Sequence, residues 1–121
     1  MHRILIVDDE AAIRSLLAIA FEKAGYEVRT APDGPEALAL CAAESFDAVL
    51  SDVVMPRMNG HDLARWIAAR HPRTRLVLMS GFDLGCQNCQ FAPRCQFLPK
   101  PFRLGEALSL VRNALAEPSA N

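Results

Sequence analysis

The sequence predicts an α/β fold with a doubly wound parallel sheet. Apolar runs of strand length alternate five times with segments of helical period along the 121 residues, and this alternation is typical of a parallel sheet with crossover helices. Polar residues follow directly after most of the apolar runs, where an open parallel sheet binds its ligands. A chain of this length has room for one domain.

The first half of the chain contains two predicted strand–helix units. The first strand, Arg3–Val7, leads into a helix that ends near Gly25, because glycine favours helix termination. Tyr26–Thr30 alternates apolar and polar residues, which predicts a short strand at a sheet edge. Asp33–Glu36 supplies turn residues and a proline at a first helical position, so a second helix begins here and extends to about residue 44. Apolar residues on one face of the first helix are Ile13, Leu16, Leu17, Ala20, Phe21 and Ala24.

The second half continues the same alternation. Phe46–Ser51 is the third predicted strand, and a helix over His61–Arg70 stops before Pro72. The fourth and fifth strands are Arg75–Met79 and Gln96–Pro99. The closing helix has one apolar stripe, made of Leu104, Ala107, Leu108, Val111 and Leu115.

The connection between the fourth and fifth strands is the least regular part, because it combines glycine, cysteine and proline. Cys86 and Cys89 form a Cys-x-x-Cys pair whose thiolates could share one Zn²⁺ ion, with Cys95 as a third ligand. His71 or a cysteine of a second molecule could complete the site, whereas Cys41 lies on the second helix, too far away. The alternatives are that the three cysteines are buried and reduced, or that two of them form a disulfide.

Composition excludes several classes of protein. The net charge is −1 and 22% of the residues are charged, without the basic stretch that nucleic-acid backbones require, so we expect no direct nucleic-acid binding. Met1–Arg3 leads into a strand without a signal-peptide segment, and the apolar runs are shorter than a membrane span. We therefore expect a cytoplasmic protein with no membrane contact. Residues 1–116 should form the domain, and 117–121 a C-terminal tail.

The polar residues that follow the strands form a candidate site. Asp8 and Asp9 come after the first strand, Asp52 after the third, Ser80 after the fourth and Lys100 after the fifth. Parallel strands bring these residues to one edge of the sheet, which a chance arrangement of solvated loops does not explain. Neighbouring carboxylates repel one another unless a hard divalent cation lies between them, so we expect Mg²⁺ or Mn²⁺. A metal ion and a lysine can neutralise a phosphoryl group while a carboxylate attacks phosphorus, which predicts an acyl-phosphate site.

Four strings carry a resemblance to a known family: "ILIVDDE", "DAVLSDVVMPRMNG", "LVLMSGF" and "FLPKPF". In this order and at these intervals, the chain resembles the receiver domain of bacterial two-component response regulators over nearly its whole length. The resemblance implies a flavodoxin-like sheet of five parallel strands in the order 2-1-3-4-5, which agrees with the alternation above. In this family the fourth connection normally contains a regular helix, so the cysteine-containing segment is a departure from the pattern.

The resemblance also assigns metal and phosphoryl roles. Asp52 would be the phosphoacceptor, and Asp8 and Asp9 would hold Mg²⁺ together with Asp52 and the backbone carbonyl of Val54. Glu10 belongs instead to the solvated start of the first helix, where a carboxylate favours the helix N-terminus.

Further positions follow from the same match. Ser80 would bond one phosphoryl oxygen and Lys100 would pair with another, while a cis Lys100–Pro101 peptide would turn the lysine toward the site. Phe97 occupies the position of a switch aromatic, although an aromatic residue in a short strand is more often part of the core.

The predicted function is a phosphorylation-dependent switch in a phosphorelay. A sensor histidine kinase or a histidine phosphotransfer protein would donate a phosphoryl group to Asp52, and an unknown protein would respond to the aspartyl phosphate. Self-dephosphorylation should be slow, because Val54 and Phe82 are apolar and cannot orient a water. Turnover on free substrates is not expected, since an aspartate-nucleophile hydrolase needs an acid where Val54 stands.

Two alternatives stay open at this stage. The chain could be the receiver module of a larger hybrid kinase or regulator. It could also be a phosphorylation-independent binding module whose Cys86, Cys89 and Cys95 bind metal or sense redox state.

Overall fold

A computed structural model describes residues 2–80 and 95–116 of the chain. Within these ranges five strands and four helices follow one another in the predicted order. Cys86, Cys89 and Phe82, and the predicted tail 117–121, lie outside the described residues. The elements are β1 (Arg3–Val7), α1 (Ala11–Lys23), β2 (Glu27–Ala31), α2 (Gly34–Ala43), β3 (Ala48–Asp52), α3 (Gly60–Arg70), β4 (Arg75–Ser80), β5 (Cys95–Pro99) and α4 (Leu104–Ala116).

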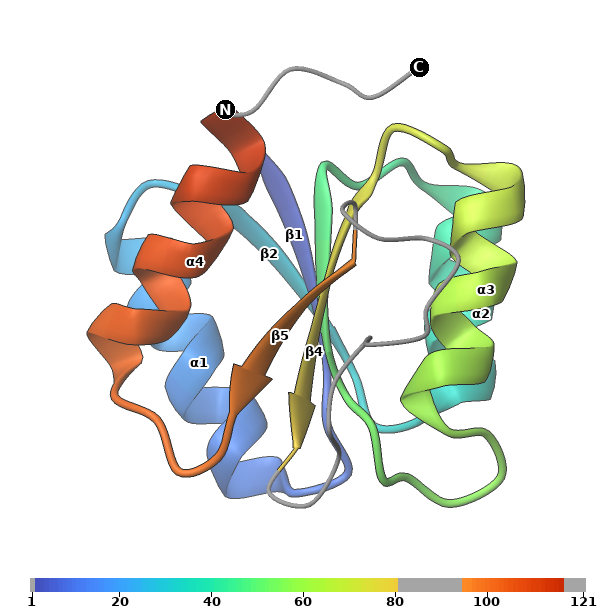
Figure 1. Cartoon of the computed structure of the whole chain (residues 1–121), viewed down its shortest axis with the longest axis horizontal. Helices are drawn as coiled ribbons and strands as arrows, with labels where there is room; N and C mark the ends of the chain where they lie inside the picture. The colour runs from blue at the N-terminus through green and yellow to red at the C-terminus, as the bar shows by residue number, and fades with distance from the viewer. Residues whose placement is uncertain (1, 81–94, 117–121) are drawn as a thin grey trace.

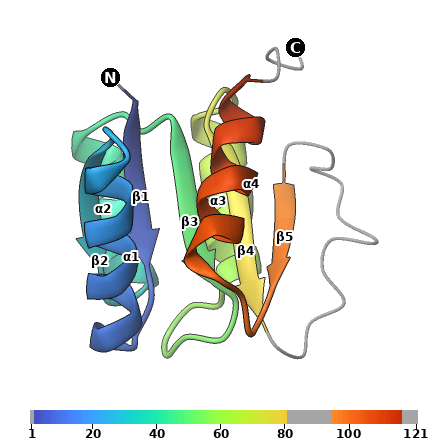
Figure 2. The ribbon, with the colours of Figure 1, turned by 90° about the vertical axis from the view of Figure 1, so that its left-hand side faces the viewer.

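The strands form one parallel sheet in the order β2-β1-β3-β4-β5, as predicted. Helices α1 and α4 cover one face, and α2 and α3 cover the other (Figure 1). Figure 2 shows the strands in this order, with α1 and α4 in front of them. None of the helices in the described ranges has both the length and the apolar character that crossing a membrane requires.

The core lies on both faces of the sheet. Along β1, Leu5 and Val7 belong to the apolar cluster that includes α2 and α3 residues, whereas Ile4 and Ile6 belong to the cluster with α1 and α4. The two clusters explain why β1, β3 and β4 each contain three or four consecutive apolar residues, since a strand covered on both faces has no exposed side.

Several element boundaries differ by one or two residues from those predicted, including both ends of β2 and the starts of α3 and β5. Strand β3 begins at Ala48, where pairing with β1 begins, and Phe46 is buried ahead of it while its carbonyl accepts a hydrogen bond from Thr74 Oγ1. The same strand includes Asp52, which pairs with Met79 in the register of β3 and β4. Strand β4 includes Ser80 in the same way, because it pairs with Pro99 of β5. Asp52 and Ser80 are therefore the last residues of their strands rather than the first residues of loops.

Short side-chain caps fix the starts of α2 and α3. Asp33 Oδ1 accepts a hydrogen bond from the Glu36 amide at 2.9 Å, and Asn59 Oδ1 accepts one from the Asp62 amide at 2.9 Å. Such caps satisfy amide groups that the first turn leaves free. Helix α1 begins differently, because its capping position, Glu10, makes no side-chain cap.

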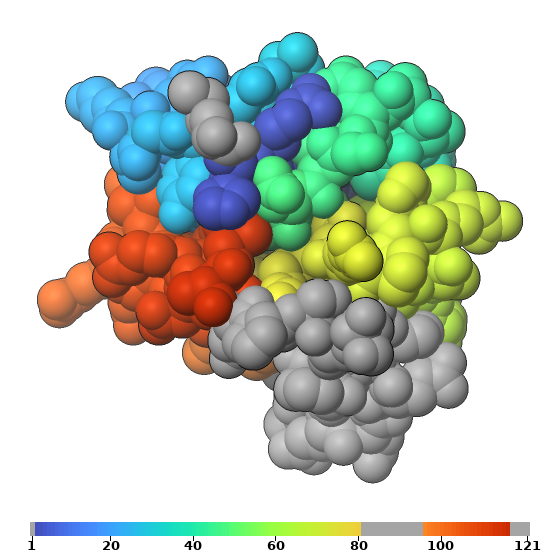
Figure 3. Space-filling model, turned by 90° about the horizontal axis from the view of Figure 1, so that it is seen from above, coloured from blue at the N-terminus to red at the C-terminus, as the bar shows by residue number. Residues whose placement is uncertain are grey.

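Figure 3 shows the molecule from the end at which the strands begin, where their amino-terminal ends lie beside the C-terminal end of α4. This end is opposite to the one where Asp52 and Ser80 end their strands. Arg3 pairs there with Glu27 and Glu44, and its backbone amide donates to Asp47 Oδ2 at 2.7 Å. Arg75 is buried, and its Nε donates to the Ala114 carbonyl at 2.9 Å, which ties the last turn of α4 to β4. These contacts connect elements far from the polar residues of the candidate site.

Candidate functional site

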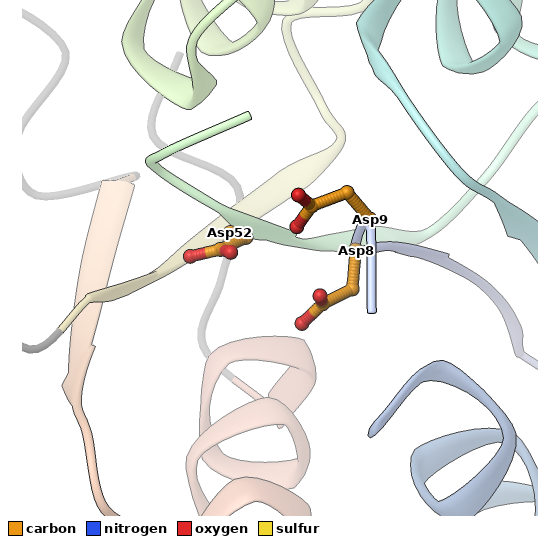
Figure 4. A group of neighbouring side chains, drawn as sticks. All are labelled: Asp8, Asp9 and Asp52. Carbon is orange, nitrogen blue, oxygen red and sulfur yellow. The ribbon is translucent and has the colours of Figure 1, made fainter. Parts of the chain in front are cut away.

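The candidate site lies at the carboxyl ends of β1 and β3. Asp8 and Asp9 follow the last residue of β1, and Asp52 ends the neighbouring strand β3 (Figure 4). One carboxylate oxygen of each residue lies within 4.8 Å of the other two. Asp8 and Asp9 are adjacent in the sequence, and Asp52 follows Asp9 by 43 residues. The fold therefore brings together carboxylates that are far apart along the chain.

Asp8 is the most deeply buried of the three. Its exposed fraction is 0%, and its Oδ1 accepts a hydrogen bond from the Glu10 amide at 2.9 Å. Burial raises the pKa of Asp8, while the Glu10 amide and the charge of Lys100 oppose that increase. A carboxylate in this setting is costly to keep charged without further partners.

Asp52 is also buried, with an exposed fraction of 6%. Lys100 Nζ lies 3.3 Å from Asp52 Oδ1 and 3.9 Å from Asp8 Oδ2. Burial raises the pKa of Asp52, and the charge and hydrogen bond of Lys100 act in the opposite direction. The lysine therefore supports a charged Asp52 carboxylate, which is the nucleophilic form.

The donor set fits a hard divalent cation. Asp8 Oδ2 is fully buried and has no hydrogen-bond partner among the described residues, since Lys100 Nζ is beyond hydrogen-bond distance. The oxygens of Asp8, Asp9 and Asp52 are close enough to bind one ion, and Asp9 is exposed, which leaves room for retained water. Few carboxylates with retained waters are the arrangement that Mg²⁺ prefers.

A cavity of about 820 Å³ opens beside these carboxylates. Asp9, Asp52, Ser80 and Lys100 supply polar groups to its wall, and Val54 is 67% exposed at its edge. The peptide between Lys100 and Pro101 is cis, as the resemblance to receiver domains implies. The rest of the wall is mainly apolar and comes from α1 and from the segment that leads into α4: Ile13, Leu16, Leu17, Pro101, Phe102 and Leu104.

Leu16 corrects one expectation from helical spacing. The apolar pattern placed it with the core-facing residues of α1, but it is 52% exposed, as is Ile19 on the same helix. Periodicity alone does not distinguish a residue that packs in the core from one at the rim of a cavity, since both are apolar.

Gly60 was not predicted as part of the site, although it lies directly behind it. Its amide donates to the Val53 carbonyl at 2.8 Å, and a Cβ at this position would lie 2.5 Å from the Asp52 carbonyl oxygen. Only glycine lets the start of α3 approach the backbone of β3 this closely. The glycine after "MPRMN" is the signal that could have identified it.

The remaining predicted residues lie outside the carboxylate cluster. Phe97 is partly buried and packs against the cluster of α2 and α3, so its switching role stays a prediction. Cys95 begins β5 and pairs with Leu76, and His71 is the residue at which α3 ends. Because Cys86 and Cys89 are outside the described residues, the zinc site stays a prediction too.

Known proteins resemble this chain over nearly its full length. It is 37% identical over 117 residues to the DNA-binding transcriptional regulator NtrC of Rhizobium meliloti, covering 95% of this chain and 24% of that protein. It is 36% identical over 116 residues to the sensor kinase CckA of Brucella abortus, covering 93% of this chain and 12% of that protein. The chain thus spans about a quarter or less of these two relatives.

Solved structures resemble the fold closely. The chemotaxis response regulator CheY4 of Vibrio cholerae superimposes with a TM-score of 0.83 at 30% identity, covering 94% of this chain and 98% of that chain. The response regulator TrrA of Thermotoga maritima, solved in complex with Mg²⁺ and BeF, gives a TM-score of 0.83 at 30% identity, covering 94% and 99%. The receiver domain of the hybrid histidine kinase CckA gives 0.80 at 32% identity, covering 93% and 98%.

The family described as "Response regulator receiver domain" matches residues 4–112. This range contains every strand of the sheet except the first residue of β1, as well as most of α4, and it includes the carboxylate cluster, Ser80 and Lys100. Sequence, fold and site agree, and the chain belongs to the response regulator receiver domain family.

Proposed function

We propose that Asp52 accepts a phosphoryl group from a phosphohistidine, with Mg²⁺ held by Asp8, Asp9, Asp52 and the backbone carbonyl of Val54. Receiver domains bind Mg²⁺ at an acidic pocket and interact with histidine kinases or phosphotransfer proteins. The observation that carries the assignment is the buried Asp8 Oδ2, which has no hydrogen-bond partner among the described residues and lies in a cluster of three carboxylates with Lys100 beside Asp52. Mn²⁺ suits the same oxygen ligands.

In the proposed reaction, an Asp52 carboxylate oxygen attacks phosphorus. The new bond joins this oxygen to phosphorus, and the bond from phosphorus to the imidazole nitrogen breaks, so its electron pair returns to the histidine of the donor. Lys100 faces Asp52 Oδ1 at 3.3 Å before the reaction and is placed to pair with a phosphoryl oxygen afterwards. Ser80 at the end of β4 supplies a hydroxyl on the same cavity wall. The metal supplies positive charge against the transferring group.

The direct test is metal-dependent phosphorylation of the whole chain. Incubation with acetyl phosphate and Mg²⁺ should add one phosphoryl group, measured by intact-protein mass spectrometry. The same incubation with a chelator should leave the mass unchanged, because Asp8 and Asp9 would then repel the incoming phosphate. Equal phosphorylation with and without metal contradicts the proposal.

The apolar part of the cavity wall suits the protein that carries the phosphohistidine. Leu16 and Ile19 of α1 are each 52% exposed, and Phe102 and Leu104 line the same cavity as Asp52. An exposed apolar surface beside a polar reaction centre is typical of a docking site. A donor helix packed against α1 would present its histidine to the cavity.

Leu16→Glu should therefore slow transfer from a phosphorylated histidine kinase by about tenfold or more, since a charge would face the apolar partner. Phosphorylation by acetyl phosphate should stay at the wild-type rate, because this small donor needs no docking surface. Ala69→Glu, exposed on α3 at the other face of the sheet, is the matched control. Equal transfer rates for Leu16→Glu and the wild type would place the docking surface elsewhere.

The phosphorylated state should be long-lived, because Val54 is apolar and exposed at the cavity edge, where it cannot orient an attacking water. Val54→Asn should shorten the lifetime severalfold by supplying a polar group there, whereas Val54→Ala should not. The decay of phosphorylated protein, followed by mass spectrometry after donor removal, measures the effect. Equal decay in Val54→Asn and Val54→Ala would show that this position does not control hydrolysis.

We also propose that this receiver domain works as one module together with kinase or regulator domains. The similarity to CckA and NtrC, each several times longer than this chain, supports a receiver module that works with kinase or regulator domains. In either arrangement the phosphoryl donor and the responding protein would act in the cytoplasm. Membrane and nucleic-acid contact form no part of the proposal for this domain.

A further inference from the structure

Arg14 lies in the second turn of α1 and makes a contact that the proposed chemistry does not use. Its Nη1 donates a hydrogen bond to the backbone carbonyl oxygen of Asp8 at 2.6 Å. The residue is half-buried, and the α1 residues that line the cavity are Ile13, Leu16 and Leu17 rather than Arg14. Arg14 therefore contacts the backbone that carries Asp8 and is not among the residues that line the cavity.

The Asp8 carbonyl needs this donor because of where β1 ends. Asp8 has an exposed fraction of 0%, and its amide still continues the sheet by donating to the Ala31 carbonyl at 3.2 Å. Its carbonyl lies past Val7, the last residue of the strand. A buried carbonyl without a donor costs free energy comparable to a lost hydrogen bond, and Arg14 supplies the donor.

The bond orients two carboxylates at once. The carbonyl of Asp8 belongs to the peptide plane that joins Asp8 to Asp9, so a donor that fixes this plane limits the directions of both side chains. The start of α1 lacks a side-chain cap, and the amide of Glu10, the residue before the helix, donates to Asp8 Oδ1. Arg14 thus connects the helix to the turn that carries both residues.

We infer that Arg14 is a positioning residue for metal binding: it holds the Asp8–Asp9 peptide so that both carboxylates face Asp52. The inference deepens the proposed function and depends on Mg²⁺ binding at that cluster. Groups that orient metal ligands from outside the ligand set commonly contribute a factor of about 10 to 100 in metal affinity. A lysine at this position would keep a charged donor but not the planar geometry of the guanidinium.

Mg²⁺ affinity of the unphosphorylated chain, measured by isothermal titration calorimetry, tests the inference. Arg14→Met should weaken binding by about tenfold or more, and Arg14→Lys should recover part of the loss. Arg112→Met, which removes an exposed arginine from the second half of α4, should bind like the wild type. Thermal unfolding of Arg14→Met, Arg14→Lys and Arg112→Met in a chelator should give a cooperative transition well above the temperature of the titration, so that a loss of affinity is separated from a loss of folding.

If Arg14→Met does not fold, Arg14→Ala takes its place, since alanine also removes the donor and favours a helix. Wild-type affinity in folded Arg14→Met or Arg14→Ala would overturn the inference. A wild-type chain that binds no Mg²⁺ would overturn the proposed function itself, and the two failures are therefore distinguishable.

Discussion

Asp52→Asn is expected to abolish phosphorylation by acetyl phosphate in the presence of Mg²⁺. The substitution replaces the buried carboxylate at the end of β3 with an amide of nearly the same shape, so the fold is kept while the nucleophile is removed. Intact-protein mass spectrometry should show the phosphorylated mass for the wild type and only the unmodified mass for the variant.

A matched substitution distinguishes loss of the nucleophile from loss of charge. Asp62→Asn removes a carboxylate from the first turn of α3, outside the cavity wall, and should be phosphorylated like the wild type. Phosphorylated Asp52→Asn would mean that Asp8 or Asp9 attacks phosphorus, and would overturn the assignment of Asp52. Asp52→Ala should behave like Asp52→Asn, since neither side chain offers a charged oxygen.

Much of this site could be predicted because the carboxyl ends of parallel strands meet at one edge of a sheet. Asp8, Asp9, Asp52, Ser80 and Lys100 each stand at the end of an apolar run, so their convergence follows from the alternation of strands and helices. The cis peptide before Pro101 was predicted from the family pattern rather than from any local signal.

Other features depend on tertiary contacts that residue spacing does not encode. Adjacent aspartates look equivalent in the sequence, yet Asp8 is fully buried and Asp9 is exposed, because the chain turns between them toward α1. Arg14 reads as a polar residue on a helix surface, and its bond to the Asp8 carbonyl depends on how α1 leaves the sheet. Leu16 fits the apolar pattern of the core but lines a cavity instead.

Without metal, the Asp8→Asn variant is expected to be more stable than the wild type. With saturating Mg²⁺, it is expected to be less stable than the wild type. Without metal, the wild type keeps a buried carboxylate oxygen, Oδ2, with no hydrogen-bond partner among the described residues. Leaving such a group unpaired costs about 1 to 3 kcal/mol. An asparagine would keep the acceptor for the Glu10 amide and place an amide donor beside the carboxylates of Asp9 and Asp52.

The pKa of Asp8 gives this prediction a pH dependence. Burial raises the pKa in the folded chain, so the folded state binds the proton more tightly than the unfolded state does. The free energy of unfolding of metal-free wild type should therefore decrease as pH rises from the unfolded value of 3.8 through the raised folded value. Above that pH range the loss of stability caused by the charged Asp8 is complete. The free energy of unfolding of Asp8→Asn should decrease less over the same pH interval, because only Asp52, whose pKa burial also raises, then contributes to the decrease.

Magnesium should reverse the order of stability, because a ligand that binds only the folded state adds free energy according to its concentration relative to Kd. At a Mg²⁺ concentration of about 100 times Kd, the free energy of unfolding of the wild type should increase by about 2.7 kcal/mol. This gain exceeds most of the range of about 1 to 3 kcal/mol expected as the cost of the unpaired Asp8 oxygen. Asp8→Asn loses a charged ligand and should gain far less stability at the same Mg²⁺ concentration.

Urea denaturation at pH 7, with chelator and with Mg²⁺, measures both differences in stability. Asp62→Asn serves again as the control, and it should respond to metal like the wild type. The reversal requires that one carboxylate both destabilises the empty site and binds the ion. Asp8→Asn that is less stable than the wild type in both conditions would show that this carboxylate is held by contacts other than the metal.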